Sequence, residues 1–181
     1  MQSADQLYSA ILSGIYERIQ FTTLYGKHAT RKKEAQTLLH NPIISALDAV
    51  AKEQGIPEGK HNSWFGRAHR CDVLYSNAFV EFKFAQSDYA KNNINYANAV
   101  YAEMAQARDM NRNCFYLFMV DSDIISEGQR DTWKPFVEHF PGFLLCLYDS
   151  HDHSLSFPHR SLKDWTLEFQ RTFTNTDSNA A

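Results

Sequence analysis

The chain has 181 residues, of which 44% are hydrophobic and 22% are charged, and its formal net charge is −3. This composition is typical of a folded domain and excludes an intrinsically disordered segment. We expect residues 1–181 to form a single domain that needs neither a disulfide nor a metal to fold. The charge excludes a global positive field, although a local basic patch would still contact phosphates.

The N-terminal part of the chain has the spacing of helices. Residues 4–20 carry leucine or isoleucine at every fourth position, which predicts one amphipathic helix. Residues 30–55 show helical spacing again, with Thr30 as a candidate cap and Asn41-Pro42 in the middle. This second segment forms either one kinked helix or two helices.

Strands follow the helical part. The segment IPEGKHNS at 56–63 has turn residues and no period, and it predicts a connection. Residues 64–68, 70–76 and 79–84 are apolar, β-branched or aromatic in the manner of strands, and a short turn at 76–77 joins the last two. These residues predict three consecutive strands.

The rest of the chain alternates between helix and strand. Residues 92–110 have helical spacing, whereas the apolar runs at 114–120 and 143–149 are typical of strands covered on both faces. A short helix is expected over 161–173. The order predicts an α/β architecture in the broad sense, with a central mixed β-sheet flanked by helices.

Three charged residues interrupt the apolar pattern of the hairpin RCDVLYSNAFVEFKF at 70–84. Because side chains alternate along a strand, Glu81 and Lys83 share one face, and their apolar neighbours share the other. Asp72 lies on the preceding strand, where it can approach Glu81 across the hairpin. We therefore expect two carboxylates and an ammonium group to meet.

Two adjacent carboxylates suit a divalent cation. They repel each other unless a cation lies between them, and a small set of oxygen ligands suits Mg²⁺ (or Mn²⁺), which keeps several waters. Such an ion activates a water and polarises a phosphoryl oxygen. Lys83 would position or deprotonate the attacking water, or neutralise charge on the phosphate. The three residues predict phosphodiester hydrolysis.

In this sequence, Asp72 is followed by eight residues and then by Glu81-Phe82-Lys83. This pattern resembles the Asp…(Asp/Glu)-x-Lys motif of the PD-(D/E)XK nuclease superfamily. Its members place the motif on a β-hairpin preceded by a helix and followed by a helix and a strand, an order that matches residues 27–120. The resemblance implies a restriction endonuclease-like core. It also implies a Mg²⁺-dependent DNA endonuclease of restriction-enzyme type, for which a homodimer that cuts both strands is suitable.

Family members often supply a further acid from the preceding helix. The segment GKHATRKKEAQTLL at 26–39 resembles that helix, with Glu34 as the catalytic and metal-binding acid, while Asp48 and Glu17 are weaker candidates. The basic residues KHATRKK at 27–33 could hold a phosphate backbone nearby. Cys71 stands where the family usually has a proline, which has no chemical role.

Other interpretations of the hairpin charges and of the fold remain open. The hairpin charges could be a solvated face, and the fold could serve as a non-catalytic binding module, such as an immunity or assembly partner. RNA or branched DNA could replace duplex DNA as substrate. The histidines at 151, 153 and 159 are read as surface residues and not as a zinc site, because no third ligand has a fixed spacing.

Three further patterns concern environment and cofactors. Cys71, Cys114 and Cys146 lie in apolar runs without a close pair, which indicates reduced thiols. No phosphate-loop pattern occurs, so we expect no nucleotide cofactor. No leader pattern and no stretch of about 18 apolar residues is present, and we expect a cytoplasmic protein with no membrane contact.

Overall fold

A six-stranded mixed β-sheet forms the centre of the computed structural model, which describes residues 2–26, 29–65, 69–85, 89–110 and 112–174. The strands lie in the order in which they occur along the chain. They are β1 (Lys60–Phe65), β2 (His69–Leu74), β3 (Ala78–Ala85), β4 (Asn113–Asp121), β5 (Phe143–Asp149) and β6 (Ser154–Ser156). The predicted α/β class and the mixed sheet are confirmed.

The sheet combines antiparallel and parallel strand pairs. β1, β2 and β3 form an antiparallel meander, whereas β4 runs parallel to β3 and β5 runs parallel to β4. β6 returns antiparallel at the far edge. Parallel neighbours need a crossover connection, and helices between β3 and β4 and between β4 and β5 supply it.

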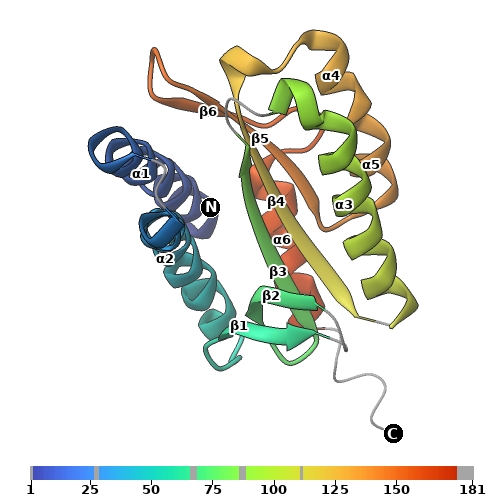
Figure 1. The fold of residues 1–181 in the computed structure, drawn as a ribbon. Helices are drawn as coiled ribbons and strands as arrows, with labels where there is room; N and C mark the ends of the chain where they lie inside the picture. The colour runs from blue at the N-terminus through green and yellow to red at the C-terminus, as the bar shows by residue number, and fades with distance from the viewer. Residues whose placement is uncertain (1, 27–28, 66–68, 86–88, 111, 175–181) are drawn as a thin grey trace, which may run out of the picture.

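Helices cover both faces of the sheet (Figure 1). Their bounds are α1 (Gln2–Tyr25), α2 (Ala29–Glu53), α3 (Tyr89–Asp109), α4 (Glu127–Thr132), α5 (Lys134–His139) and α6 (Leu162–Thr174), with a short 3-10 turn, η1 (Ser122–Ile124). Helices α1, α2 and α6 share one core cluster with the sheet, and α3 and α5 share the other. Within the described residues, no helix is long and apolar enough to cross a membrane.

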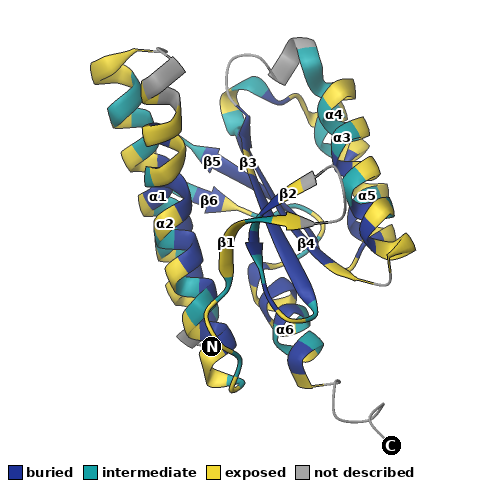
Figure 2. Cartoon of the chain, turned by 60° about the horizontal axis from the view of Figure 1, so that its bottom comes forward, coloured by how far each residue is buried: buried dark blue, intermediate teal, exposed yellow. Residues whose placement is uncertain are grey.

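The two cores use opposite faces of the same strands. Val80, Phe82 and Phe84 of β3 pack toward α1, α2 and α6, while Phe79 and Ala85 pack toward α3. In Figure 2, the buried residues of α1 and α2 lie on the side of these helices that faces the sheet, and their exposed residues lie on the outer side. This alternation sends Glu81, between Val80 and Phe82, toward the α3 face.

The second helical segment is one helix. α2 runs through Pro42 without interruption, and it begins at Ala29, one residue before the predicted cap. Its close approach to α1 depends on Gly14, because a Cβ at that position would lie 2.5 Å from the carbonyl oxygen of Leu39. Packing between α1 and α2 therefore fixes the position of the part of α2 that carries His40.

Several boundaries differ from the sequence-based prediction. The segment predicted as a connection at 56–63 enters β1 at Lys60, so the strand expected at 64–68 begins earlier, and residues 66–68 lie outside the described part. β1 is an edge strand whose residues 60–62 and 64 are exposed, which explains its polar sequence. The short elements α4, α5 and β6 were not predicted.

All three cysteines are buried and free, as the sequence predicted. Burial raises the pKa of the Cys71 thiol to about 12, and the nearby Glu81 carboxylate adds to this shift. Cys71 is therefore a protonated packing residue at neutral pH.

Candidate active site

Asp72 lies where the pairing between β2 and β3 stops. The two strands pair at Val73 with Val80 and at Leu74 with Phe79. At the next position, the Oδ2 atom of Asp72 accepts a hydrogen bond from the backbone N–H of Phe82 over 2.8 Å. A side-chain oxygen thus takes the role that a backbone carbonyl has in a regular ladder, and it fixes the carboxylate beside β3.

The carboxyl groups of Asp72 and Glu81 come together, as predicted. Glu81 is 8% exposed and makes a side-chain hydrogen bond with Asp72. Burial, the negative charge of Asp72 and that of Glu103 raise the pKa of Glu81 to about 10, and Lys83 opposes the shift. This raised pKa favours the protonated form of Glu81 at neutral pH, in which its carboxyl group can donate to Asp72.

Two further residues, Glu103 and Tyr116, extend this site. Neither was predicted from the sequence as a site residue. Tyr116 stands opposite Glu81 in the parallel pairing of β3 with β4. Burial raises the pKa of Tyr116, as do the charge of Glu103 and a hydrogen bond to it. Glu103 lies on α3 between the buried residues Val100 and Ala107, so an acid on an apolar helix face was the available signal.

Lys83 follows Glu81 on the same face of β3, but its side chain is exposed to solvent. Its Nζ atom lies 5.4 Å from the ring centroid of Tyr96 on α3, within the range of a cation–π contact. Because the charge of Lys83 lowers the pKa of Glu81, the ammonium group acts electrostatically on the carboxyl pair. Lys83 therefore shares the strand face of Glu81, while its ammonium group lies over the Tyr96 ring.

His40 of α2 contacts the other side of Asp72. Its Nδ1 atom lies 3.4 Å from Oδ1 of Asp72, and its ring packs edge-on against Phe82 at 5.3 Å. Burial lowers the pKa of His40 more than Asp72 raises it, so the imidazole is neutral at pH 7. No regular spacing in the sequence links a helical histidine to Asp72.

Glu34 was predicted to supply the third acid, and its side chain is exposed on α2. The helical residue that the structure places beside Asp72 is His40, nearly two turns farther along. Among the weaker candidates, Asp48 accepts hydrogen bonds from the Gly59 N–H at 2.9 Å and the Tyr75 hydroxyl at 2.8 Å, which is a structural role. Glu17 is exposed on α1.

Two other sequence features lie away from the carboxyl pair. In the basic stretch at 27–33, Lys27 and His28 are outside the described residues, and the guanidinium carbon of Arg31 lies 4.3 Å from the Tyr25 ring centroid. His151 contacts Asp123 at 3.4 Å, and His153 contacts the hydroxyl of Tyr148 at 3.1 Å.

The donor set at Asp72 and Glu81 fits a small divalent cation in its chemistry. Over the described ranges, no group of three histidine, cysteine, aspartate or glutamate side chains is arranged to hold a metal. Two carboxylates alone are enough for Mg²⁺, which is usually held by one or two carboxylates and keeps several waters. Protonation of Glu81 and binding of a cation are alternatives, because a carboxylate ligates a metal in its ionised form.

The comparisons with known proteins add no relative. No family model matches the chain, and neither the curated proteins nor the solved structures contain a match. The site is therefore interpreted from its own geometry and from the motif that it carries.

Proposed function

We propose that the protein is a metal-dependent phosphodiesterase, a Mg²⁺-dependent DNA endonuclease with a restriction endonuclease-like core. The observation that carries this proposal is the hydrogen-bonded pair Asp72–Glu81, with Lys83 on the same strand face as Glu81. A second support is the element order, in which a helix, three antiparallel strands, a helix and a parallel strand follow one another. This order is the one that the motif's superfamily resemblance implies.

In this proposal, Asp72 and Glu81 would be the ligands of the cation. When bound, the cation would activate a water molecule and polarise a phosphoryl oxygen. Asp72 is already oriented by the Phe82 N–H and by His40. Glu81 must first release its proton to solvent, since both carboxylates ligate in their ionised form. Lys83 stabilises the charge that develops on the phosphate or orients the water.

DNA is the proposed substrate because a cation and an aromatic ring stand exposed near Asp72. The ring of Trp64 on β1 is 58% exposed, and the guanidinium carbon of Arg70 on β2 lies 4.6 Å from its centroid. Arginine binds phosphate oxygens, and an exposed tryptophan can stack on a base. A restriction-type enzyme cuts both strands, so we propose a homodimer with one site for each strand.

A metal and substrate titration tests this proposal. We expect calorimetry to detect Mn²⁺ binding to the wild type and not to Asp72→Asn, and supercoiled DNA to be cleaved with Mg²⁺ and not with EDTA. Parallel reactions with RNA and branched DNA identify the substrate class. A wild-type chain that binds no metal and cleaves none of these substrates would overturn the proposal.

A second candidate is a non-catalytic binding module with the same fold, such as an immunity or assembly partner. The raised pKa of Glu81 favours this function. When Glu81 is protonated and hydrogen-bonded to Asp72, the two buried carboxyl groups satisfy each other without any metal. The negative overall charge also agrees with it. The titration above separates the two functions, since the binding module predicts no Mn²⁺ affinity at Asp72.

A further inference from the structure

A second site lies away from the carboxyl pair, where two cavities adjoin between α3, α5 and α6. One, of about 530 Å³, is lined by Tyr101, Phe136 and Phe140 together with Pro135, Glu138 and His139. The other, of about 710 Å³, has Arg108, Arg112 and Arg171 in its lining. His139 and Phe140 line both, so the two spaces share one wall.

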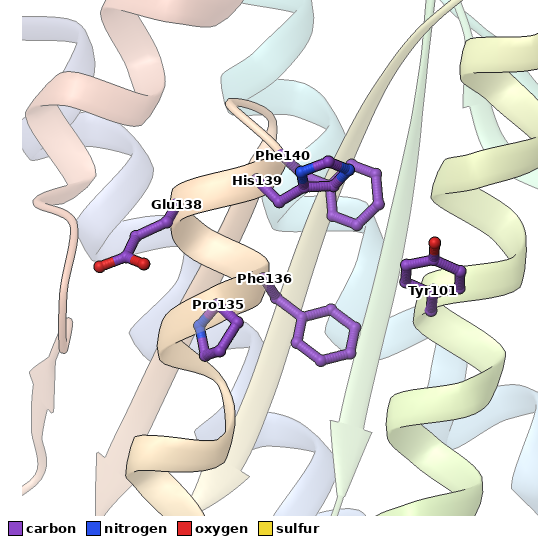
Figure 3. A pocket seen from close by; sticks show the side chains of 6 residues that line it. All are labelled: Tyr101, Pro135, Phe136, Glu138, His139 and Phe140. Carbon is purple, nitrogen blue, oxygen red and sulfur yellow. The ribbon is translucent and has the colours of Figure 1, made fainter.

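The first cavity has aromatic walls from two different elements. Tyr101 comes from α3, and Phe136 lies on α5, with Phe140 directly after that helix (Figure 3). The Tyr101 ring centroid lies 6.3 Å from that of Phe136 and 5.8 Å from that of Phe140, and both contacts are edge-on. Tyr101 is 50% exposed, so a planar ligand can reach these rings.

The second cavity has an excess of positive charge. Arg108 ends α3, Arg112 precedes β4 and Arg171 lies on α6, so three separate elements direct arginines to one place. Among the described lining residues, Glu168 is the one carboxylate, and it pairs with Arg171 at 3.6 Å. Outside the lining, Oδ1 of Asp109 lies 3.8 Å from Nε of Arg108. Arg112 donates to the Ser76 carbonyl at 2.8 Å. These contacts hold two of the guanidinium groups and leave a net positive lining, which suits a phosphate.

His139 connects the two spaces. Its Nε2 atom lies 3.3 Å from Nη1 of Arg108, and its ring stands edge-on to Phe140 at 4.7 Å. Because arginine has N–H donors and no acceptor, Nε2 of the imidazole is the acceptor in this contact. Arg108 lies seven residues after Tyr101 and hence on the same side of α3. Aromatic and cationic surfaces therefore follow one another along a single helix.

We propose that these adjoining cavities bind one nucleotide, with its base against Tyr101, Phe136 and Phe140 and its phosphate at Arg108, Arg112 and Arg171. Each volume lies within the range of small-molecule sites. A free mononucleotide and the phosphorylated end of a DNA strand present the same chemistry. This proposal does not depend on hydrolysis at Asp72 and Glu81.

Calorimetry in EDTA tests the site with AMP, adenosine and inorganic phosphate as separate probes. We expect AMP to bind at least tenfold more tightly than either of the other two. Tyr101→Ala and Arg171→Ala should each weaken AMP binding at least tenfold, while the control Lys52→Ala, at an exposed lysine in the last turn of α2, should not. Circular dichroism and thermal melting confirm that each variant is folded.

A second pair of probes identifies the source of the nucleotide. A short oligodeoxynucleotide with a 5′-phosphate should outcompete the same strand with a 5′-hydroxyl if the ligand is a strand end, whereas AMP alone binds if it is a free nucleotide. Three results would each overturn the proposal. These are AMP binding no tighter than phosphate, phenyl phosphate binding as tightly as AMP, and folded Tyr101 and Arg171 variants that keep wild-type affinity.

Discussion

Replacing Glu81 by glutamine should stabilise the folded chain, and the gain should grow with pH. Glu81 is buried beside Asp72, which raises its pKa from an ordinary value of 4.5 to about 10. Above pH 4.5 the unfolded chain loses this proton while the folded chain keeps it, so the unfolded state is favoured increasingly as pH rises toward 10. Glutamine carries a permanent N–H donor and removes this penalty.

The size of the effect follows from linkage. Between the two pKa values, each pH unit costs the wild type up to about 1.4 kcal/mol of unfolding free energy. From pH 5 to pH 8 the difference between Glu81→Gln and wild type should therefore increase by up to about 4 kcal/mol. Even half of this amount is large against the typical ~5–15 kcal/mol stability of a domain.

Urea unfolding at pH 5, 6, 7 and 8, in EDTA, measures this difference. Glu138→Gln is the matched control, because Glu138 is 66% exposed and lies 4.0 Å from Lys134 in a solvated pair. Its stability difference from wild type should stay within about 0.5 kcal/mol at every pH. A Glu81→Gln difference that is equally flat across this range would refute a shared proton between Asp72 and Glu81.

Two further predictions concern the scaffold. Gly14→Ala should lower the free energy of unfolding by roughly 1–3 kcal/mol, because the new Cβ would meet the Leu39 carbonyl oxygen at 2.5 Å. Gly128→Ala should leave it unchanged or raise it by up to about 1 kcal/mol, since nothing lies within 4 Å of the new Cβ. Chemical denaturation measures both variants, and equal effects would contradict the close helix contact. Tyr75→Phe should cost about 1.5–3 kcal/mol through loss of the 2.8 Å hydrogen bond to Asp48, and a change below 0.5 kcal/mol in the same assay would argue against that bond.

The sequence predicted the sheet better than its edges. The runs at 79–84, 114–120 and 143–149 are buried strands because their residues pack on both faces, and this leaves a continuous apolar pattern. β1 and β6 are edge strands: β1 is polar in sequence, and β6 has three residues. Neither therefore shows the apolar pattern that burial produces in a central strand. α4 had a readable signal, since Ser126 and Gln129 form a capping box at its start.

At the candidate site, local alternation was enough to place Glu81 and Lys83 together. The meeting of Asp72 with Glu81 needed the register of β2 and β3, which the short turn at 76–77 makes predictable. His40 and Glu103 reach the site from helices on opposite faces of the sheet, and their positions depend on how α2 and α3 pack. Tertiary packing of this kind produces no regular spacing of residues in the sequence from which it could be predicted.

The initial rate of Mg²⁺-dependent cleavage of supercoiled DNA, compared between wild type and Lys83→Met, tests the proposed chemistry most directly. Methionine keeps much of the length of the exposed side chain but removes the ammonium group, and it leaves the Asp72–Glu81 pair in place. We expect wild-type cleavage that EDTA abolishes, and a folded Lys83→Met variant that binds Mn²⁺ but cleaves at least 100-fold more slowly, which is about 2.7 kcal/mol of lost transition-state stabilisation. Equal cleavage rates for the two proteins, or no metal-dependent cleavage by the wild type, would contradict it.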